Sequence, residues 1–424
     1  MPKSDCMMSS DLVGITADDL TGAADTAAAF AGRRGAVGVS LGRWFRGSIS
    51  APAFAVTTDS RACAPDQAYE LAAESAYGLL KAGASLVYKK VDSNLRGNVG
   101  AEIAAVRAAV GRPVLFAPAF PARGRTTVGG VALIDNVPVA ETEMAVDPEA
   151  PVRDSAVEHV IRSQSAHLSV LNCSLSETRA GGAEIADRLC KCDVLVADAE
   201  TEGDLTLIAG AALALCPRPV VAGSAGLARA LATRLLGPAA RAHLAGTPRG
   251  PVLAILASSS GRLVEQVDRV SQQPGLAPVP LLCERLSRAD DPVPELAGAI
   301  ARARGELQAG RNAVVYATGP LPDAERPVEL VVEHLAHLAF VLVKLTSPAG
   351  LLVGGGATAH AVLAALNADA VDVDDEPLPG TAAGLVVGGH FAGRPVVLKP
   401  GVAGDESAVV ALLDYLGLRA GAER

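Results

Sequence analysis

The 424 residues are enough for two domains, and a hydrophobic content of 50% with only 43 glycines and 27 prolines excludes a low-complexity chain. Aromatic residues make up 3%, so the cores must consist mainly of Ala, Val and Leu, which favours the α/β class. The net charge is −9, and there is no run of like charge, which argues against nucleic acid as a partner.

Short apolar runs alternate with helical patterns through the first half of the chain. We expect strands at Leu12–Thr16, Phe54–Thr58, Leu86–Lys89, Val114–Ala117, Val194–Ala197 and Val220–Ala222. Helical spacing occupies Asp19–Arg33, Gln67–Ala82 and Ala101–Val110. This alternation predicts a largely parallel sheet flanked by helices, with ligands bound at the carboxyl ends of the strands.

A second alternating series follows a segment rich in Gly, Pro and Ala. We expect a first domain over residues 1–238, a linker over 239–250 and a second domain over 251–424. In the second domain, strands are expected at Val252–Leu256, Ala313–Tyr316, Phe340–Lys344, Leu351–Val353 and Val396–Leu398. Helices are expected near Arg262–Gln273, Pro294–Gln308, Ala324–His337 and Ala359–Leu366.

Targeting and cysteine patterns indicate a cytoplasmic protein. The longest apolar stretch, Leu207–Cys216, is about half the ~20 residues needed to cross a bilayer. The segment Met1–Leu12 carries two aspartates where an export signal would be apolar. The seven cysteines are scattered, without the spacing of a disulfide framework or of zinc ligands.

The first cluster of polar residues is the pair Asp18 and Asp19, between a predicted strand and a predicted helix. An aspartate here can simply cap the helix by accepting hydrogen bonds from free backbone N–H groups. One cap is sufficient for one helix, so the second carboxylate suggests a further role.

Three more polar clusters follow predicted strands. They are the TTDSR segment ending at Arg61, the KKVDSNLRGN segment that starts at Lys89, and the PAFPARGRTT segment containing Arg123 and Arg125. Each has a simple structural interpretation as an ion-paired or exposed loop. Together they suggest a pocket for a small hydroxylated acid, because the cations suit a carboxylate or phosphate and the carboxylates suit hydroxyls, a metal or a proton.

The second half carries glycine-rich turns instead of charges. Leu352–His360 runs from a strand through three glycines into a helix, a shape that exposes backbone N–H groups to a phosphate, although a plain tight turn is the alternative. Lys399–Asp405 repeats this arrangement, and Ala257–Gly261 offers a serine-rich version. The Walker P-loop sequence is absent.

These motifs resemble the four-carbon acid sugar kinases, which phosphorylate threonate, erythronate or 3-oxotetronate with ATP. The resemblance extends over nearly the whole chain and includes the segments ADDLTGAAD, TTDSR, KKVDSNLRGN, PAFPARGRTT, DPEAPVRDS, VADAETEGDL and GSAGL, followed by the glycine turns. It implies an acid-sugar-binding first domain, a nucleotide-binding second domain, and transfer in the cleft between them. The expected partners are the sugar acid, ATP with Mg²⁺ and a second copy in a homodimer, without nucleic acid or membrane.

Residue roles follow from the resemblance and from the clusters. Asp92, Asp18 and Asp19 are candidates for the residue that accepts the proton of the terminal C4 hydroxyl. The expected substrate contacts are Asp18, Asp19, Arg61, Lys90, Val91, Asp92, Ser93, Arg96 and Arg125. The expected ATP contacts are Ser258, Gly355, Gly356, Ala357, Thr358, Gly401 and Gly404.

Two departures from the family pattern concern the nucleotide. The family turn usually reads GGET where this chain has Ala357 in place of Glu, and the last loop usually reads KSGGFGD where this chain has KPGVAGD, with Val402 in place of a glycine. Within the family, threonate and erythronate are the preferred substrates, with 3-oxotetronate as the alternative.

Two functions of other classes compete with the kinase. A serine hydrolase would use Ser224, in a strand, turn and helix arrangement, with Asp375 and His390 later in the chain. A non-catalytic sugar-acid binding protein would need the charged pocket. The first leaves the charged clusters without a role, and the second has no use for the glycine turns.

Overall fold

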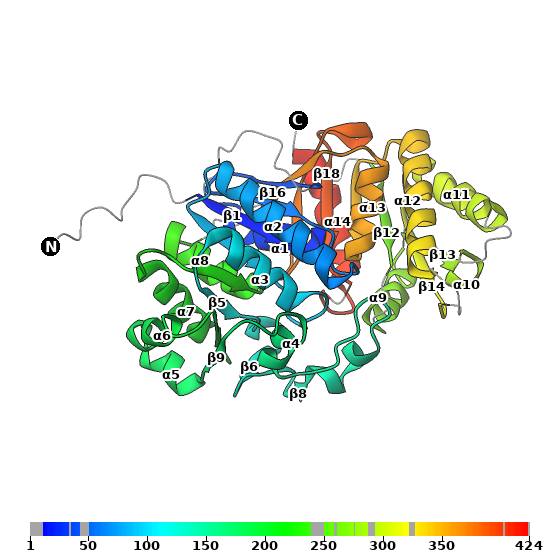
Figure 1. The fold of residues 1–424 in the computed structure, drawn as a ribbon. Helices are drawn as coiled ribbons and strands as arrows, with labels where there is room; N and C mark the ends of the chain where they lie inside the picture. Colours follow the sequence, from blue (N-terminus) through cyan, green and yellow to red (C-terminus); the bar gives the residue numbers. More distant parts are fainter. Residues whose placement is uncertain are drawn as a thin grey trace. The chain divides into compact units, whose positions relative to one another are not determined.

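A computed structural model describes residues 12–33, 35–42, 51–238, 250–257, 261–274, 276–286, 293–321, 327–401 and 403–422. The chain divides into two compact units, residues 1–240 and 241–424. The expected linker over 239–250 lies outside the described residues apart from Gly250. The α/β class predicted from the alternation of strands and helices is confirmed in both units (Figure 1).

Unit 1 contains a parallel sheet. Its strands run in the order β2 (Val37–Ser40), β3 (Ala53–Thr57), β1 (Val13–Ala17), β4 (Leu86–Lys90), β11 (Val220–Gly223), β5 (Val114–Ala117), β10 (Val194–Ala197) and β9 (Val170–Cys173). A small antiparallel sheet, β6 (Arg125–Val128), β7 (Val131–Ile134) and β8 (Val137–Pro138), follows β5. The 3₁₀ turns are η1 (Pro121–Arg123), η2 (Val139–Glu141) and η3 (Glu143–Val146).

Two groups of helices pack on the sheet of unit 1. One group is α2 (Pro65–Lys81), α3 (Val99–Val110) and α4 (Val157–Gln164), and the other is α1 (Leu20–Phe30), α8 (Ala225–Leu236), α7 (Glu202–Ala214), α6 (Gly182–Leu189) and α5 (Leu175–Ala180). Helix α1 is buried along its whole length, which explains why it is mostly alanine. As the composition predicts, Ala, Val and Leu dominate the core.

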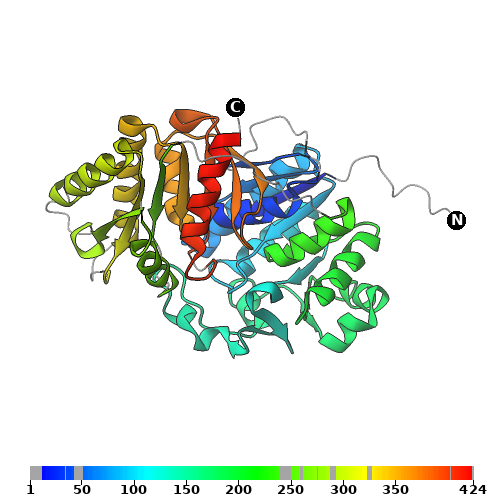
Figure 2. The ribbon, with the colours of Figure 1, turned by 180° about the vertical axis from the view of Figure 1, so that it is seen from behind.

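Unit 2 has a mixed sheet. Parallel strands run in the order β13 (Leu276–Leu282), β14 (Asn312–Thr318), β12 (Val252–Leu256), β15 (Gly350–Gly354) and β18 (Pro395–Lys399). Antiparallel β17 (Ala382–Val387) and β16 (Ala370–Asp375) continue it. Its helices are α9 (Gly261–Ser271), α10 (Cys283–Leu286), α11 (Val293–Gln308), α12 (Pro327–Thr346), α13 (Gly356–Ala365) and α14 (Ala408–Ala422), with one 3₁₀ turn, η4 (Gly389–Phe391). Figure 2 shows α14 lying along the strands that it contacts, β12, β15 and β18.

One predicted strand is wrong. The segment Phe340–Lys344 is the last part of helix α12, not a strand. The β-branched and aromatic run favours a strand locally, but the buried residues of α12 include Leu335, Leu338 and Leu342, whose spacing of three and four places them on one helical face. Tertiary packing of that face decides the conformation.

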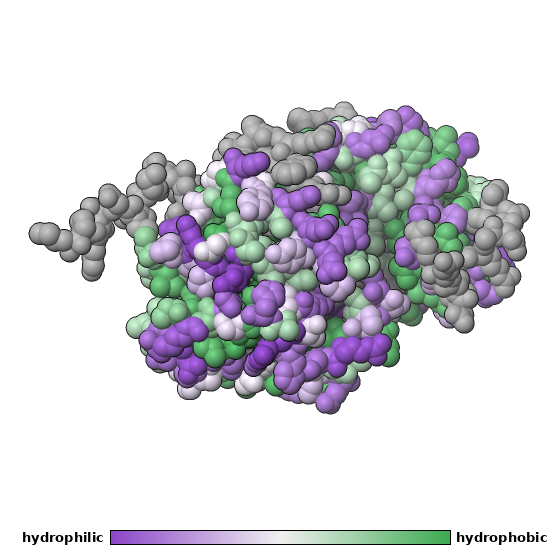
Figure 3. Space-filling model, in the orientation of Figure 1, coloured by the Kyte–Doolittle hydropathy of each residue, from purple (hydrophilic) through white to green (hydrophobic). Residues whose placement is uncertain are grey.

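The described surface and helices bear on two further expectations. Figure 3 shows hydrophilic and hydrophobic residues interspersed on the visible face. Within the described ranges, no helix is long and apolar enough to span a membrane.

Candidate active site

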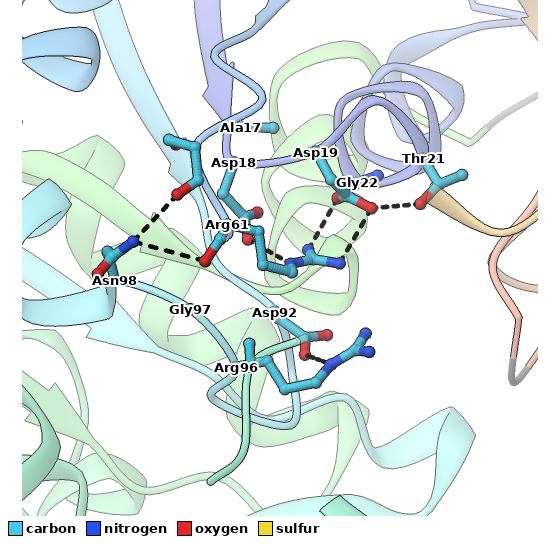
Figure 4. A network of polar contacts seen from close by, with 12 residues as sticks. Ala17, Asp18, Asp19, Thr21, Gly22, Arg61, Asp92, Arg96, Gly97 and Asn98 are labelled. Carbon is cyan, nitrogen blue, oxygen red and sulfur yellow. Dashed lines mark hydrogen bonds and ion pairs between the residues drawn. The ribbon is translucent and has the colours of Figure 1, made fainter. Parts of the chain in front are cut away.

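Polar residues that follow three neighbouring strands of unit 1 meet at one edge of its sheet. Strand β1 lies between β3 and β4, and its last residue, Ala17, is in register with Thr57 and Lys90. All three strands are parallel, so the segments after them leave the sheet at the same edge. The structure thereby brings together the aspartate pair, Arg61 and the segment from Lys90 to Arg96 (Figure 4).

Arg61 binds both aspartates of the pair. Its Nε donates to Asp18 Oδ2 at 2.7 Å, and its Nη1 and Nη2 contact the two oxygens of Asp19 at 3.1 and 2.9 Å (Figure 4). The guanidinium is 9% exposed. Burial alone would lower the pKa of Arg61, but Asp18 and Asp19 raise it well above its usual value. This pairing fixes three buried charges in one geometry.

Asp19 also caps helix α1. Its Oδ1 accepts from the Gly22 backbone N–H at 2.9 Å, and its Oδ2 accepts from Thr21 Oγ1 at 2.6 Å. Burial opposes the charged form, but Arg61 and Lys90 hold the pKa of Asp19 below its usual value. Asp19 therefore serves both as a helix cap and as a partner of Arg61, whereas Asp18 does not cap the helix.

Lys90 and Asp92 lie beside this pair. Lys90 is 6% exposed, and within the described part of the chain no carboxylate lies at ion-pair distance from its ammonium group. Asp92 Oδ2 accepts from Arg96 Nε at 2.7 Å, and Arg96 Nη1 reaches Asp147 Oδ2 at 3.2 Å. Burial opposes ionisation, but Arg96, Arg61 and Lys90 hold the pKa of Asp92 far below its usual range.

The loop that carries Arg61 is supported by buried side chains that sequence reasoning did not single out. Asn98 Nδ2 donates to the carbonyls of Ser60 at 3.0 Å and Cys63 at 2.9 Å. Glu102 accepts from Ser60 Oγ and pairs with Lys89 Nζ at 2.8 Å. Asn98 and Lys89 lie within a noted motif, whereas Glu102 is an ordinary helical residue whose role appears only in the fold.

The other expected substrate residues have different environments. Val91 is buried in the core, and its N–H donates to the Gly223 carbonyl at 2.8 Å. Ser93 is partly buried in the same loop. Arg125 opens β6, where its Nε donates to Asn94 Oδ1 at 3.2 Å. Burial and the charge of Arg123 lower the pKa of Arg125 to about 10.

A cavity of about 440 Å³ opens onto Arg61 in unit 1. Arg61, Gly97 and Asn98 line one side, and the segment from Glu149 to Asp154 with helix α4 lines the other. Its volume is ample for a small sugar acid.

The glycine turns of unit 2 also follow neighbouring strands. Leu256, Gly354 and Lys399, at the ends of β12, β15 and β18, lie side by side in register. Gly355 has φ +104°, and a Cβ there would lie 2.3 Å from the Ala257 carbonyl oxygen, so only glycine fits. Ser258, an expected ATP contact, and Val402 lie outside the described residues.

Helix α13 begins at Gly356, directly after this turn. No side chain caps it, so the N–H groups of its first turn, which includes Ala357 and Thr358, lack intrahelical partners. The second glycine loop runs beside it: Lys399 Nζ donates to the Gly401 carbonyl at 3.1 Å, and Gly404 has φ +79°.

The structure removes the basis of the hydrolase alternative. Ser224 is fully buried, its Oγ donates to the Ala119 carbonyl and accepts from the Gly226 N–H at 3.0 Å, and it caps helix α8. Asp375 is bound to the Tyr415 hydroxyl at 2.8 Å. Ser224 is therefore a structural cap and not an exposed nucleophile.

No group of three or more His, Cys, Asp or Glu side chains suited to a metal ion occurs among the residues that the structure describes.

Comparison with known proteins follows the same two-part division. Residues 13–231 match a sugar-binding N-terminal domain, and residues 253–409 match a nucleotide-binding C-terminal domain. A crystal structure from Salmonella typhimurium LT2 has the same fold, with a TM-score of 0.77 and 21% identity over 96% of this chain and 99% of that one.

Characterised relatives are kinases of related acids. A D-threonate kinase of Salmonella typhimurium is 31% identical over 95% of this chain and 97% of its own length. A D-erythronate kinase of Heliobacterium modesticaldum is 30% identical, with the same coverage, and a 3-oxo-tetronate kinase of Methylobacterium radiotolerans is 33% identical over 95% of this chain and 99% of its own. The resemblance noted in the motifs is confirmed, and the chain belongs to the family of four-carbon acid sugar kinases.

Proposed function

We propose that this enzyme transfers the γ-phosphoryl group of ATP to the C4 hydroxyl of D-threonate or D-erythronate. The observation that carries the proposal is the buried site of unit 1, where a lysine without a carboxylate partner among the described residues lies beside ionised aspartates. A sugar acid offers a carboxylate to the cation and hydroxyls to the aspartates. The names of the relatives support the same chemistry.

Asp92 is the best candidate to accept the proton of the C4 hydroxyl. Both oxygens of Asp19 are bound, and the second oxygen of Asp18 is buried without a partner. Asp92 binds Arg96 through Oδ2 alone, and no described residue donates to its Oδ1. A weak carboxylate base suffices because phosphoryl transfer depends mainly on positioning and on charge stabilisation.

The remaining contacts divide by chemistry. Lys90 would bind the carboxylate of the acid, and Arg61 would orient the aspartate pair while presenting its own outer surface to the substrate. Arg125 and Arg96 would add positive charge, and Ser93 a hydroxyl. Val91 would contribute through its backbone, because its side chain lies in the core.

ATP would bind to the glycine turns of unit 2. The first turn of α13 offers N–H groups to phosphate oxygens at the positive end of the helix, and the glycines leave room for the phosphates to approach the backbone. Gly355, Gly356, Ala357 and Thr358 would form this cradle, with Gly401, Gly404 and Ser258 beside it. Mg²⁺ would arrive bound to the phosphates and supply positive charge during transfer.

This assigns residues 1–238 to the sugar acid and residues 251–424 to the nucleotide. We also expect the enzyme to work in the cytoplasm, where ATP is available, and to form a homodimer, which sedimentation of the purified chain measures.

The test is an activity screen on the full chain. ADP release is followed with ATP, Mg²⁺ and, separately, D-threonate, D-erythronate, 3-oxo-tetronate and the neutral polyol threitol. We expect turnover with a hydroxylated acid, little with threitol, and a product whose phosphate NMR signal identifies a C4 ester. ATP consumption with none of the acids would contradict the proposal.

A further inference from the structure

The cavity beside Arg61 has a wall whose role the proposed chemistry leaves open. The segment between η3 and α4 contributes Glu149, Arg153 and Asp154 to the lining, opposite Arg61 and Asn98. A ligand that reaches Arg61 through this cavity must pass these side chains. The wall is therefore in a position to read the middle of the sugar acid.

A chain of contacts ties this wall to the proposed base. Asp92 binds Arg96, and Arg96 binds Asp147. Asp147 in turn accepts through Oδ1 from the backbone N–H groups of Glu149 at 3.1 Å and Ala150 at 2.9 Å. The backbone of Glu149 is thus held at a fixed position relative to Asp92.

The Glu149 carboxylate has no fixed partner in the described structure. It forms neither a hydrogen bond nor an ion pair with any described residue. The cations that act on it are Arg61 and Arg96, and the anions are Asp19 and Asp147, all of them members of the site. Burial raises the pKa of Glu149 above its usual value. A carboxylate that is shielded from water and lacks a donor can accept a hydrogen bond from a ligand.

We propose that Glu149 is a specificity-determining residue that accepts a hydrogen bond from the C2 or C3 hydroxyl of the sugar acid. This inference rests on the proposed function. A hydroxyl can donate to the carboxylate, whereas the carbonyl of a 3-oxo acid has only lone pairs to present. Glu149 would therefore select hydroxy acids against 3-oxo acids, because the wrong pairing leaves two acceptors facing each other.

The experiment compares kcat/KM for D-threonate, D-erythronate and 3-oxo-tetronate in the wild type, Glu149→Gln and Glu149→Ala. We expect the wild type to favour its best hydroxy acid over the 3-oxo acid by ~10²-fold or more. The amide of Glu149→Gln can donate to a carbonyl, so this ratio should fall by ~10-fold or more, with KM for ATP unchanged. Glu149→Ala should lower kcat/KM for the hydroxy acid. Glu143→Gln, an exposed change in η3, is the matched control and should keep the wild-type ratio.

Three outcomes separate the inference from the proposed function. A wild type that turns over none of the three acids would refute the kinase proposal itself. A wild type that prefers 3-oxo-tetronate, or a Glu149→Gln variant that keeps the wild-type ratio within twofold while its melting temperature is unchanged, would overturn the role of Glu149 and leave the kinase intact.

Discussion

The two units use the same edge of a parallel sheet in opposite ways. In unit 1, the strands β3, β1 and β4 end in charged side chains that bind one another, and in unit 2, the strands β15 and β18 end in glycines that present the backbone. A sugar acid must be recognised by its separate functional groups, which requires side chains. A phosphate can be bound by backbone N–H groups at a helix end.

This difference predicts opposite sensitivities to mutation. The site in unit 1 depends on groups that are present, and each buried charge needs its partner. The turns in unit 2 depend on space that is left empty. Unit 1 should therefore fail when a side chain is removed, and unit 2 should fail when one is added.

The largest effect is expected for Asp92→Asn. Loss of the proposed base should lower kcat by ~10²–10⁴-fold, because general bases contribute on that order. ATP affinity, measured by calorimetry, should stay at the wild-type value because the change lies in unit 1. A kcat close to that of the wild type would transfer the base role to Asp18 or Asp19.

The next effect concerns stability in unit 1. Lys89→Met leaves Glu102 buried without its 2.8 Å partner, and both side chains are almost completely buried. The free energy of unfolding should fall by about 3–5 kcal/mol, as for other broken buried pairs. Urea unfolding measures it, and Lys191→Met, which breaks an exposed pair with Asp187, is the control that should change little. Equal losses in the two variants would refute a structural role for the buried pair.

A smaller effect is expected when a methyl group is added in unit 2. Gly355→Ala would place Cβ 2.3 Å from the Ala257 carbonyl and strain a backbone with φ +104°. We expect KM for ATP to rise by ~10-fold, matching a strain of about 1–2 kcal/mol, while KM for the sugar acid changes little. Gly310→Ala is the matched control, with φ +77° and open space around it. If both KM values rise equally, the turn is structural and the phosphate role is wrong.

The smallest effect is on the pH dependence of stability. Asp92 has a folded-state pKa below its unfolded value of about 3.9, so its stabilising contribution is complete above that value and is lost as the pH falls through the folded pKa. The free energy of unfolding should fall below about pH 5, and Asp92→Asn should reduce that fall by roughly 1–2 kcal/mol. Asp66→Asn, an exposed change in α2, should retain the wild-type slope. An unchanged slope in Asp92→Asn would mean that the carboxylate is not ionised more readily in the folded state.

The sequence alone determined the local elements and the placement of polar residues along them. Strands β5, β10 and β12 have the predicted bounds, because short apolar runs between polar turns have few alternatives. The positions of Asp18, Arg61 and Lys90 after strands were readable for the same reason, and the family was readable from ordered motifs. At Phe340–Lys344 the same reasoning failed, because a short apolar run fits a strand or a buried helix equally well.

Only the tertiary structure decided which groups meet. Arg61 pairs with Asp18 and Asp19 because β3 lies next to β1, and Asn98 and Glu102 support the Arg61 loop because α3 packs beneath it. Strand order and helix packing depend on contacts between residues distant in the chain, which no local pattern encodes. The cavity wall at Glu149 has the same origin, since the contact between Arg96 and Asp147 joins segments 51 residues apart.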